Sequence, residues 1–381
     1  MKTVGIITYH KYYNYGTMLQ AYALAEKINR MGYSAEVIDF KQKNDFKGFQ
    51  LIKLRLKRLP FYIKNFRDYK VLHDHKNDIS LKNSEFDKFF NKNIPIGNIK
   101  YSETEELKQN PPQYDAYIVG SDQTWNPYVS NNPEAFYLNF INEGRKKGSY
   151  APSIAVSKLS SEQKEKYKKN LSDFAFLSCR EETGSKLLSE ILGKPVTTVL
   201  DPTLLLDYKD WKEVSEFINI KKPYILTYFL GDNKIHRDYV KKLSEKTGYR
   251  IVTLPIAPQD MMEKSFEKIW TGPSGFLYLI KNAACLCTDS FHGTMFAVNF
   301  NTPFFSFYKT KDDSKESENS RIYNSLEKFS LSNRIVKDFT LDPNLEMSFD
   351  KANEILKNER IKSENYLLNM LKTITSEENY K

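Results

Sequence analysis

The chain has 381 residues, a length that favours two domains of ordinary size and excludes a single small module. Hydrophobic residues make up 40% and charged residues 28%, which excludes a disordered chain and predicts a globular protein with apolar cores. The net charge is +9, from 57 Lys or Arg against 48 Asp or Glu. Much of the surplus is local, because residues 41–75 hold ten Lys or Arg against three Asp.

The most apolar window, 294–308, is interrupted by two asparagines and a proline, so we expect no membrane-spanning helix. The amino terminus runs directly into a short strand-like segment and lacks the longer apolar core of a secretory signal. We therefore expect a cytoplasmic protein. Three cysteines at 179, 285 and 287 are too few for a disulfide framework and have no metal-binding spacing, so we expect buried thiols and no metal site.

The first forty residues predict one βαβ unit, with a strand at 3–8, a helix at 17–31 that Gly32 ends, and a strand at 35–40. Such units imply a parallel sheet. Residues 41–112 interrupt the alternation with basic and aromatic residues, and we expect a helical insertion there. Strand-like residues 116–119 then resume the sheet.

The first domain is expected to reach residue 208 and the second to span 209–381. Later strands of the first domain are predicted at 148–155, 175–178 and 196–200. Strands of the second domain are predicted at 224–230, 250–254, 284–288 and 303–307. A closing helix at 350–373 could pack back across the first domain. Two Rossmann-like, doubly wound α/β domains of this kind would face each other across a cleft at the carboxyl ends of their strands.

Two polar loops follow strands of the first domain. His10, Asn14 and Gly16 lie between the first strand and the first helix, where unpaired backbone N–H groups favour an anionic or hydroxyl-rich ligand. The second loop combines hydrogen-bonding side chains with an indole, a composition suited to sugars, in Ser121, Asp122, Gln123 and Trp125. The alternatives are a turn formed by Asn14 and Gly16, and a structured loop in which Asp122 caps a helix and Trp125 is core.

Two further motifs carry charge chemistry. Arg180 follows a strand and offers a planar fork of donors to a carboxylate or phosphate, although it could equally pair with Glu181 or Asp201. His292 lies among small polar residues at a helix start, where the dipole favours bound anions, and is the strongest catalytic candidate. The small residues beside it are Ser290, Gly293 and Thr294. A structural histidine is the alternative.

Five segments together resemble the polysaccharide pyruvyl transferase family: NYGTMLQAYAL, YDAYIVGSDQTWNP, FLSCREETGS, VLDPTLLL and TDSFHGTMFA. The resemblance implies a GT-B-like pair of Rossmann-type domains, with the acceptor side in the first domain and the donor side in the second. Characterised members transfer pyruvate from phosphoenolpyruvate onto a sugar as a ketal and release phosphate. The implied partners are phosphoenolpyruvate as co-substrate, with no other cofactor, and a saccharide of a surface polysaccharide or its lipid-linked precursor.

By this resemblance His292 is the catalytic histidine and Arg180 an anion-binding arginine for the donor. Several characterised members carry Arg-Leu-His where this chain has Ser-Phe-His at 290–292, so one expected arginine is missing. Arg321 could supply that charge from elsewhere. Ser290, Gly293 and Thr294 complete the predicted donor site, and the two polar loops the acceptor site. A glycosyltransferase that uses a nucleotide sugar and a non-catalytic carbohydrate-binding homologue are the alternative functions.

Residues 41–75 interleave apolar with basic side chains. Such a segment can lie on an anionic membrane surface, where each Lys or Arg contributes about 1 kcal/mol. Alternatively, its apolar residues pack on the first domain and its charges are solvated, since they follow no clean 3.6-residue period. Nucleic acid is not an expected partner, because no recognised binding module accompanies the charge.

Overall fold

The computed structural model describes residues 1–41, 66–129, 134–308, 319–340 and 343–376. Its first sheet is built from β1 (Thr3–Ile7), β2 (Ser34–Phe40), β3 (Ile96–Tyr101), β4 (Ala116–Val119) and β5 (Lys147–Ser149). Its second sheet is built from β8 (Tyr224–Tyr228), β9 (Arg250–Thr253), β10 (Glu267–Lys268), β11 (Cys285–Thr288) and β12 (Phe304–Ser306). A short parallel pair, β6 (Ser178–Cys179) and β7 (Thr197–Thr198), follows the first sheet.

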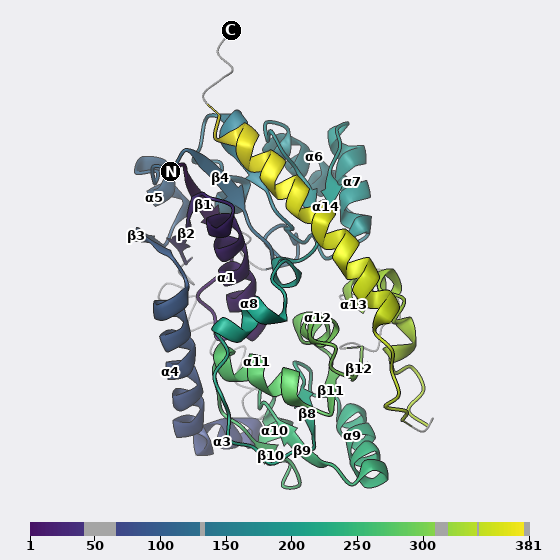
Figure 1. Ribbon diagram of the computed structural model, residues 1–381. Coiled ribbons are helices and arrows are strands. Elements are labelled where there is room, and N and C mark those ends of the chain that lie inside the picture. The colour runs from purple at the N-terminus through teal and green to yellow at the C-terminus, as the bar shows by residue number, and fades with distance from the viewer. Residues whose placement is uncertain (42–65, 130–133, 309–318, 341–342, 377–381) are drawn as a thin grey trace.

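Both sheets are parallel, and their strand orders are β3-β2-β1-β4-β5 and β10-β9-β8-β11-β12. In each sheet the chain starts in the middle, runs to one edge and then crosses to the other side. This is the doubly wound topology, which places ligand sites at the crevice beside the first strand. The predicted fold class, two Rossmann-like domains in a GT-B-like arrangement, is confirmed (Figure 1).

Helices cover the two sheets. In the first domain they are α1 (Tyr15–Arg30), α3 (Phe66–Asp74), α4 (Lys76–Asn93), α5 (Thr104–Gln109), α6 (Ser161–Leu171) and α7 (Glu182–Leu192). The link to the second domain holds the short 3-10 helix η3 (Pro202–Leu204) and α8 (Tyr208–Glu213). The remaining helices are α9 (Lys234–Thr247), α10 (Pro258–Met262), α11 (Pro273–Asn282), α12 (Phe291–Phe300), α13 (Asn319–Lys328) and α14 (Asp350–Ile374).

The segment 41–112 is more than a helical insertion, which corrects the prediction from sequence. Its residues Ile96–Tyr101 form β3, which pairs with β2 at the edge of the first sheet. Most of β3 is exposed or only half-buried, so it lacks the apolar run that marks a central strand. Residues 42–65, on which most of the membrane hypothesis rests, lie outside the described part of the chain.

The strand predicted at 148–155 ends early, at Ser149. The backbone takes left-handed φ values at Ala151 (57°) and Ala155 (52°), which no strand can contain. The chain there forms a buried irregular segment next to β6, and its turns bring Ser153 and the residues after Cys179 toward the carboxyl end of the sheet.

A continuous apolar core joins the two domains. It includes Ile6 of β1, Leu226 of β8 and Leu371 of α14, all fully buried. Tyr15 at the start of α1 stacks on Phe276 of α11 with ring centres 4.4 Å apart. The two sheets therefore share one core at their junction.

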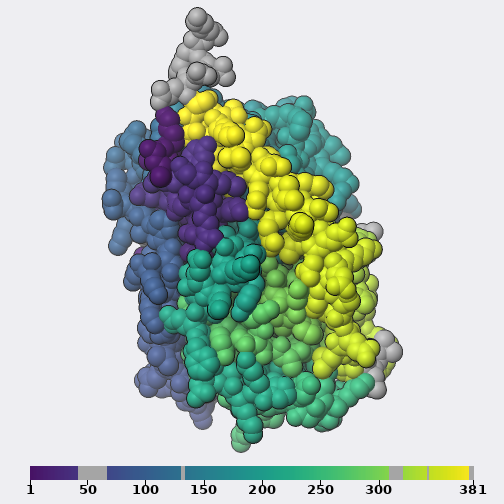
Figure 2. Space-filling model, viewed as in Figure 1, coloured from purple at the N-terminus to yellow at the C-terminus, as the bar shows by residue number. Residues whose placement is uncertain are grey.

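Helix α14 leaves the second domain and crosses back over the first (Figure 1). Tyr366 on this helix donates from its hydroxyl to the carbonyl oxygen of Ser149 at 3.1 Å, and Glu364 pairs with Lys27 of α1 at 2.6 Å. In Figure 2 the helix forms an unbroken band on the surface over both domains.

Within the described ranges, every helix is too short or too polar to cross a bilayer. The same residues contain no cluster of three or more His, Cys, Asp or Glu side chains arranged to hold a metal ion. All three cysteines are buried and unpaired in disulfides.

Candidate active site

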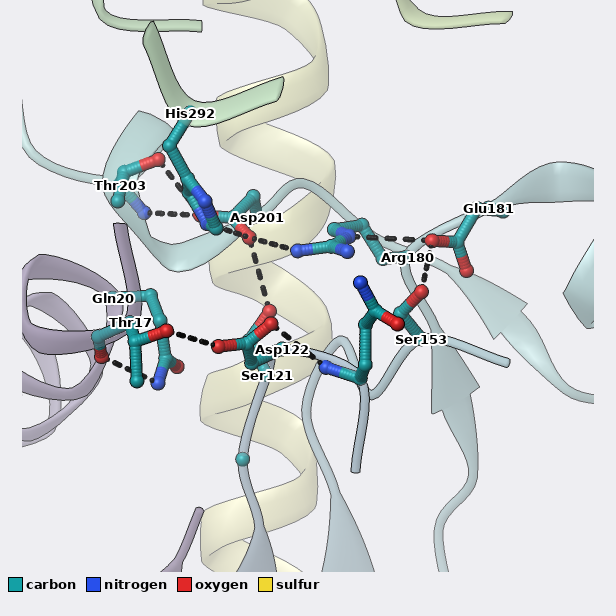
Figure 3. Close-up of polar contacts among 12 residues, drawn as sticks. Thr17, Gln20, Ser121, Asp122, Ser153, Arg180, Glu181, Asp201, Thr203 and His292 are labelled. Atoms are coloured by element: carbon teal, nitrogen blue, oxygen red, sulfur yellow. Dashed lines mark hydrogen bonds and ion pairs between the residues drawn. The ribbon is translucent and has the colours of Figure 1, made fainter. Parts of the chain in front are cut away.

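Three side chains from separate segments converge on the carboxylate of Asp201, at the junction of the two domains (Figure 3). Its Oδ2 accepts hydrogen bonds from Arg180 Nη1 at 2.8 Å and from Ser121 Oγ at 3.0 Å, and His292 Nε2 lies 3.4 Å away. Its Oδ1 accepts from the backbone N (3.0 Å) and the hydroxyl (2.7 Å) of Thr203. Asp201 is therefore a buried carboxylate whose two oxygens are both held in place.

The charge of Asp201 is stabilised by its neighbours. Burial alone would raise the pKa of this carboxyl, but His292 and Arg180 outweigh burial and hold the pKa well below its usual value. Asp201 thus remains an anion beside His292. A carboxylate next to an imidazole orients the ring and stabilises its protonated form, which suits a residue that gives and takes a proton.

The position of the His292 ring depends on a glycine of the first domain. The residue stands in the first turn of α12, and its ring reaches across the junction to the start of α1. A Cβ on Gly16 would come within 2.1 Å of His292 Nδ1, so any side chain there would displace the ring. The first turn of α1 therefore needs glycine at position 16 to make room for the histidine.

Arg180 is buried with an incomplete set of partners. Its Nε donates to Glu181 at 3.3 Å, its Nη1 donates to Asp201, and its guanidinium lies over the ring of Phe291 at 4.4 Å. Both structural pairings considered for it from sequence are thus present. Its Nη2 is also buried, yet it has no hydrogen-bond partner among the described residues. Burial would lower the pKa of Arg180, but the two carboxylates raise it above its usual value, so it remains a cation with a free N–H group.

A cavity of about 480 Å³ opens beside these residues, with walls from both domains. Arg180 and Asp201 line it from the first domain, and Phe291 and Met295 of α12 line it from the second. Arg321 of α13 also lines it, so the structure brings this arginine to the same cavity as Arg180. Two guanidinium groups therefore belong to the lining of one cavity.

The loop after β4 connects this cavity with α1. With its side-chain amide in the orientation that satisfies its contacts, Gln123 accepts hydrogen bonds from both terminal nitrogens of Arg321 at 3.1 Å. Asp122 adopts a left-handed backbone (φ 69°) and accepts from the Thr17 hydroxyl at 2.7 Å and from the Gln123 backbone N at 2.9 Å. Asn14 caps α1 by accepting from the backbone N of Thr17 at 3.1 Å. These residues form one polar border between the domains.

The small residues predicted for the donor site all have a structural task. Ser290 caps α12, because its hydroxyl accepts from the backbone N of Gly293 at 3.3 Å. Thr294 is fully buried, and its hydroxyl bonds to the Ser290 carbonyl (3.0 Å) and the Ser306 hydroxyl (2.7 Å). A Cβ on Gly293 would lie 2.8 Å from the Thr288 hydroxyl. All three position the start of α12. Full burial excludes Thr294 from ligand contact, whereas donor binding by Ser290 and Gly293 stays a prediction.

Two residues predicted to bind the acceptor are enclosed in the first domain. Trp125 is fully buried and donates its indole N–H to the carbonyl oxygen of Phe136 at 2.9 Å, so its rings cannot cover a sugar. His10 is 1% exposed, with one ring nitrogen 2.9 Å from the Thr8 carbonyl oxygen and the other 3.4 Å from Asp39. We correct both predictions, because these side chains are committed to the fold.

Asp201 is the residue of the site whose importance the sequence did not reveal. Its position after a strand and before Pro202 made it a partner for Arg180, but nothing in the local pattern pointed to His292. Thr17, which the sequence also did not single out, donates to Asp122. Ser121, predicted on the acceptor side, donates to Asp201. Polar residues directly after strands were the available signal.

Solved structures with a similar fold have low identity to this chain. UDP-GlcNAc 2-epimerase from Methanocaldococcus jannaschii is 12% identical with a TM-score of 0.49, covering 100% of this chain and 95% of that one. The E. coli heptosyltransferase WaaC with ADP is 11% identical with a TM-score of 0.40, covering 81% and 88%. The glycosyltransferase VinC in complex with dTDP is 10% identical with a TM-score of 0.42, covering 98% and 99%.

No curated protein sequence matches the chain significantly. The model of one protein family, described as polysaccharide pyruvyl transferase, matches residues 14–309. This range is well over half of the chain and contains Gly16, Asp122, Arg180, Asp201 and His292. The protein therefore belongs to the polysaccharide pyruvyl transferase family.

Proposed function

We propose that the protein transfers the pyruvyl group of phosphoenolpyruvate to two hydroxyls of a saccharide, which forms a cyclic ketal and releases phosphate. The acceptor would be a sugar of a surface polysaccharide or of its lipid-linked precursor. The observation that carries the proposal is Arg180, a buried arginine whose Nη2 has no partner among the described residues. It lines one cavity together with Arg321 and Asp201, and His292 lies 3.4 Å from Asp201.

The donor would bind through its two anionic groups. Phosphoenolpyruvate carries a carboxylate and a phosphate on a three-carbon unit, and guanidinium groups match both in charge and geometry. Arg180 is held rigidly by Glu181 and Asp201, so binding an anion at its Nη2 costs little ordering of the side chain. Arg321, which lines the same cavity, would neutralise the second anionic group.

The proton balance of ketal formation needs one acid and base at the site. Protonation of the enol carbon C3 makes C2 electrophilic, and the first sugar hydroxyl adds to C2 and loses its proton. Cleavage of the bond between C2 and the phosphate oxygen releases phosphate, after which the second hydroxyl adds and loses its proton. Of the two hydroxyl protons, one replaces the proton given to C3 and the other leaves with phosphate. His292, oriented by Asp201, would carry these protons, and the arginines would stabilise the departing phosphate.

One feature of the second domain favours phosphoenolpyruvate over a nucleotide sugar. In Rossmann-type domains the loop after the first strand holds nucleotide phosphates on its backbone N–H groups. Here the N–H groups of Leu230 and Gly231, directly after β8, donate to the carboxylate of Asp289 at 2.6 and 2.9 Å. An internal carboxylate thus takes the place that a nucleotide phosphate would need.

Titration calorimetry with phosphoenolpyruvate, UDP-GlcNAc, ADP and dTDP tests the donor. We expect binding of phosphoenolpyruvate alone, and Arg180→Lys should weaken it about tenfold, because lysine keeps the charge but loses the second donor of the planar fork. Arg237→Lys is the matched control. Arg237 also forms a buried ion pair, with Asp260 at 2.6 Å, but it lies outside the residues that line the cavity.

Binding of a nucleotide sugar without binding of phosphoenolpyruvate would overturn the proposal in favour of a glycosyltransferase. Phosphate release in the presence of a panel of hexose glycosides with free hydroxyl pairs then tests transfer. Donor binding with no release on any such acceptor would support a carbohydrate-binding homologue.

A further inference from the structure

Helix α12 is fastened to the loop that carries Asp201 by one asparagine. Asn299 stands two turns after His292 on this helix, on the side that faces residues 201–206. Its Nδ2 donates to the carbonyl oxygens of Thr203 at 3.1 Å and of Leu206 at 2.9 Å. Thr203 lies in the short helix η3 and Leu206 follows its end, and the Thr203 carbonyl also accepts from Trp211 Nε1 at 3.2 Å.

An arginine from α14 completes this contact. Arg360 donates from Nε to the carbonyl oxygen of Leu204 at 2.7 Å and from Nη2 to Asn299 Oδ1 at 3.0 Å. One guanidinium thus bonds both to the loop and to the asparagine that holds the loop. We call these two side chains, with the three carbonyls they bind, the Asn299–Arg360 clamp.

The same helix also holds the residue before Asp201. The buried hydroxyl of Ser363, one turn after Arg360, accepts from the backbone N of Leu200 at 3.0 Å. Helix α14 therefore bonds to the segment around Asp201 on both sides. It lies beyond residue 309, where the match to the family model ends.

We infer that Asn299 and Arg360 are positioning residues of the active site, which hold α12 and the 201–206 loop in the register that places His292 against Asp201. The distance that depends on this register is the 3.4 Å between His292 Nε2 and Asp201 Oδ2. His292 and Asp201 belong to different domains, so contacts across the domain junction set this distance. An error of about 1 Å in such a placement is enough to reduce turnover about a hundredfold.

Hydrogen exchange measured by mass spectrometry tests the clamp without any ligand. In Arg360→Met we expect peptides covering 201–206 and 291–300 to exchange about tenfold faster, because charged hydrogen bonds that restrain local opening are lost. Arg360→Lys should restore part of the protection, since an ammonium can still reach one carbonyl. Asn299→Ala should raise exchange in the same two segments, and it decides the question if Arg360→Met does not fold.

Glu364→Gln is the matched control, because it weakens another polar contact of α14, the ion pair with Lys27, and removes neither hydrogen bond of Arg360. We expect it to leave exchange in both segments unchanged. If Glu364→Gln and Arg360→Met change exchange equally, or if neither changes it, the clamp does not exist as inferred.

The role in the reaction rests on the proposed function and has its own readout. With phosphoenolpyruvate and an acceptor, Arg360→Met should lower kcat more than it raises KM for the donor, whereas Glu364→Gln should change neither. If the protein binds no phosphoenolpyruvate, the proposed function is refuted. Hydrogen exchange then still tests whether the Asn299–Arg360 clamp restrains the two segments. Normal kcat in Arg360→Met despite faster exchange would show that the clamp serves stability alone.

Discussion

A single carboxylate decides how the charged residues of the cavity are arranged. Asp201 accepts from Arg180 and Ser121 through one oxygen and faces His292 with the same oxygen. Because it is buried and ionised, each of these neighbours is held by charge as well as by hydrogen bonding. Removing the histidine still leaves Asp201 with four hydrogen bonds, which come from Arg180, Ser121 and Thr203.

Replacing His292 by alanine should abolish turnover without unfolding the protein. The proposed proton carrier is lost, which costs about 10² to 10⁴ in rate. Phosphate release from phosphoenolpyruvate with acceptor measures the loss, and circular dichroism checks the fold. His73→Ala is the control, since this exposed histidine on α3 should be dispensable. Wild-type turnover of His292→Ala would make the catalytic assignment wrong.

Gly16→Ala should damage the site through a steric contact. The new Cβ would lie 2.1 Å from Nδ1 and 2.4 Å from Cγ of His292, so the ring must move away from its present place. Overpacking of this kind costs about 1 to 3 kcal/mol, against a gain of about 1 kcal/mol in helix propensity. We expect turnover to fall far more than stability.

A double-mutant cycle checks this cause. The destabilisation by Gly16→Ala, measured by urea unfolding, should shrink in a His292→Ala background, where the two closest ring atoms are absent. An equal cost in both backgrounds would show that the histidine is not what the new methyl group meets.

At the scale of the elements, α9 carries a histidine that links stability to pH. His236 is 3% exposed and lies among the rings of Phe229, Phe307 and Phe339. Burial, and then the neighbouring charge of Arg237, lower its pKa to about 4. The folded protein therefore keeps this side chain neutral at pH values where the unfolded chain protonates it.

Stability should accordingly fall as the pH drops from about 6.5 to about 4, because only the unfolded state takes up the proton in that window. The loss from this residue approaches about 3 kcal/mol at the acid end, at 1.36 kcal/mol per pH unit. Urea unfolding of the wild type and of His236→Leu at pH 7.5 and 4.5 measures it. The variant should lose less stability between the two values, and an identical loss in both proteins would contradict the assignment.

At the scale of the whole molecule, the two domains share their main core. The apolar cluster that contains Ile6 of the first sheet also contains Leu226 of the second and Leu371 of α14. If the two domains unfolded independently, the unfolding of one would expose part of this shared cluster to water. The two domains should therefore unfold together.

Leu371→Ala tests this coupling. The side chain is fully buried, so its truncation should cost about 2 to 5 kcal/mol. Calorimetry should show one transition in the wild type, and the variant should move that transition as a whole to lower temperature. Two separate transitions, of which only one shifts, would show that the domains unfold independently.

The sequence allowed most of the regular elements to be predicted, because the signals for them are local. The strand predicted at 116–119 has the bounds of β4, and the helix predicted at 17–31 is α1, which begins two residues earlier and ends one residue earlier. Strand β3 was not predicted, because an edge strand with exposed side chains lacks the apolar run that marks a strand in the sequence. The strand predicted at 148–155 was too long. Its end is set by left-handed residues at Ala151 and Ala155, and the sequence has no glycine at these positions to indicate a turn.

The site was predictable in part. Arg180, Arg321 and His292 are brought to one region, as polar residues that follow strands or border the junction. The structure overturned the ligand-binding roles of Trp125 and Thr294, since both side chains are fully buried. A tryptophan beside polar residues suits a sugar platform and a core position equally well. Only the packing of the loop after β4 decides between them.

By itself the sequence determined most of the order of strands and helices, the two-domain α/β class and the family, because periodicity, caps and motif spacing are encoded over a few neighbouring residues. The tertiary structure alone decided that Asp201 meets His292, that Gly16 yields space to the imidazole ring, and that α14 reaches back to the 201–206 loop. These contacts join residues far apart in the chain across the domain junction. Their geometry depends on how two sheets pack together, and no local pattern contains that information.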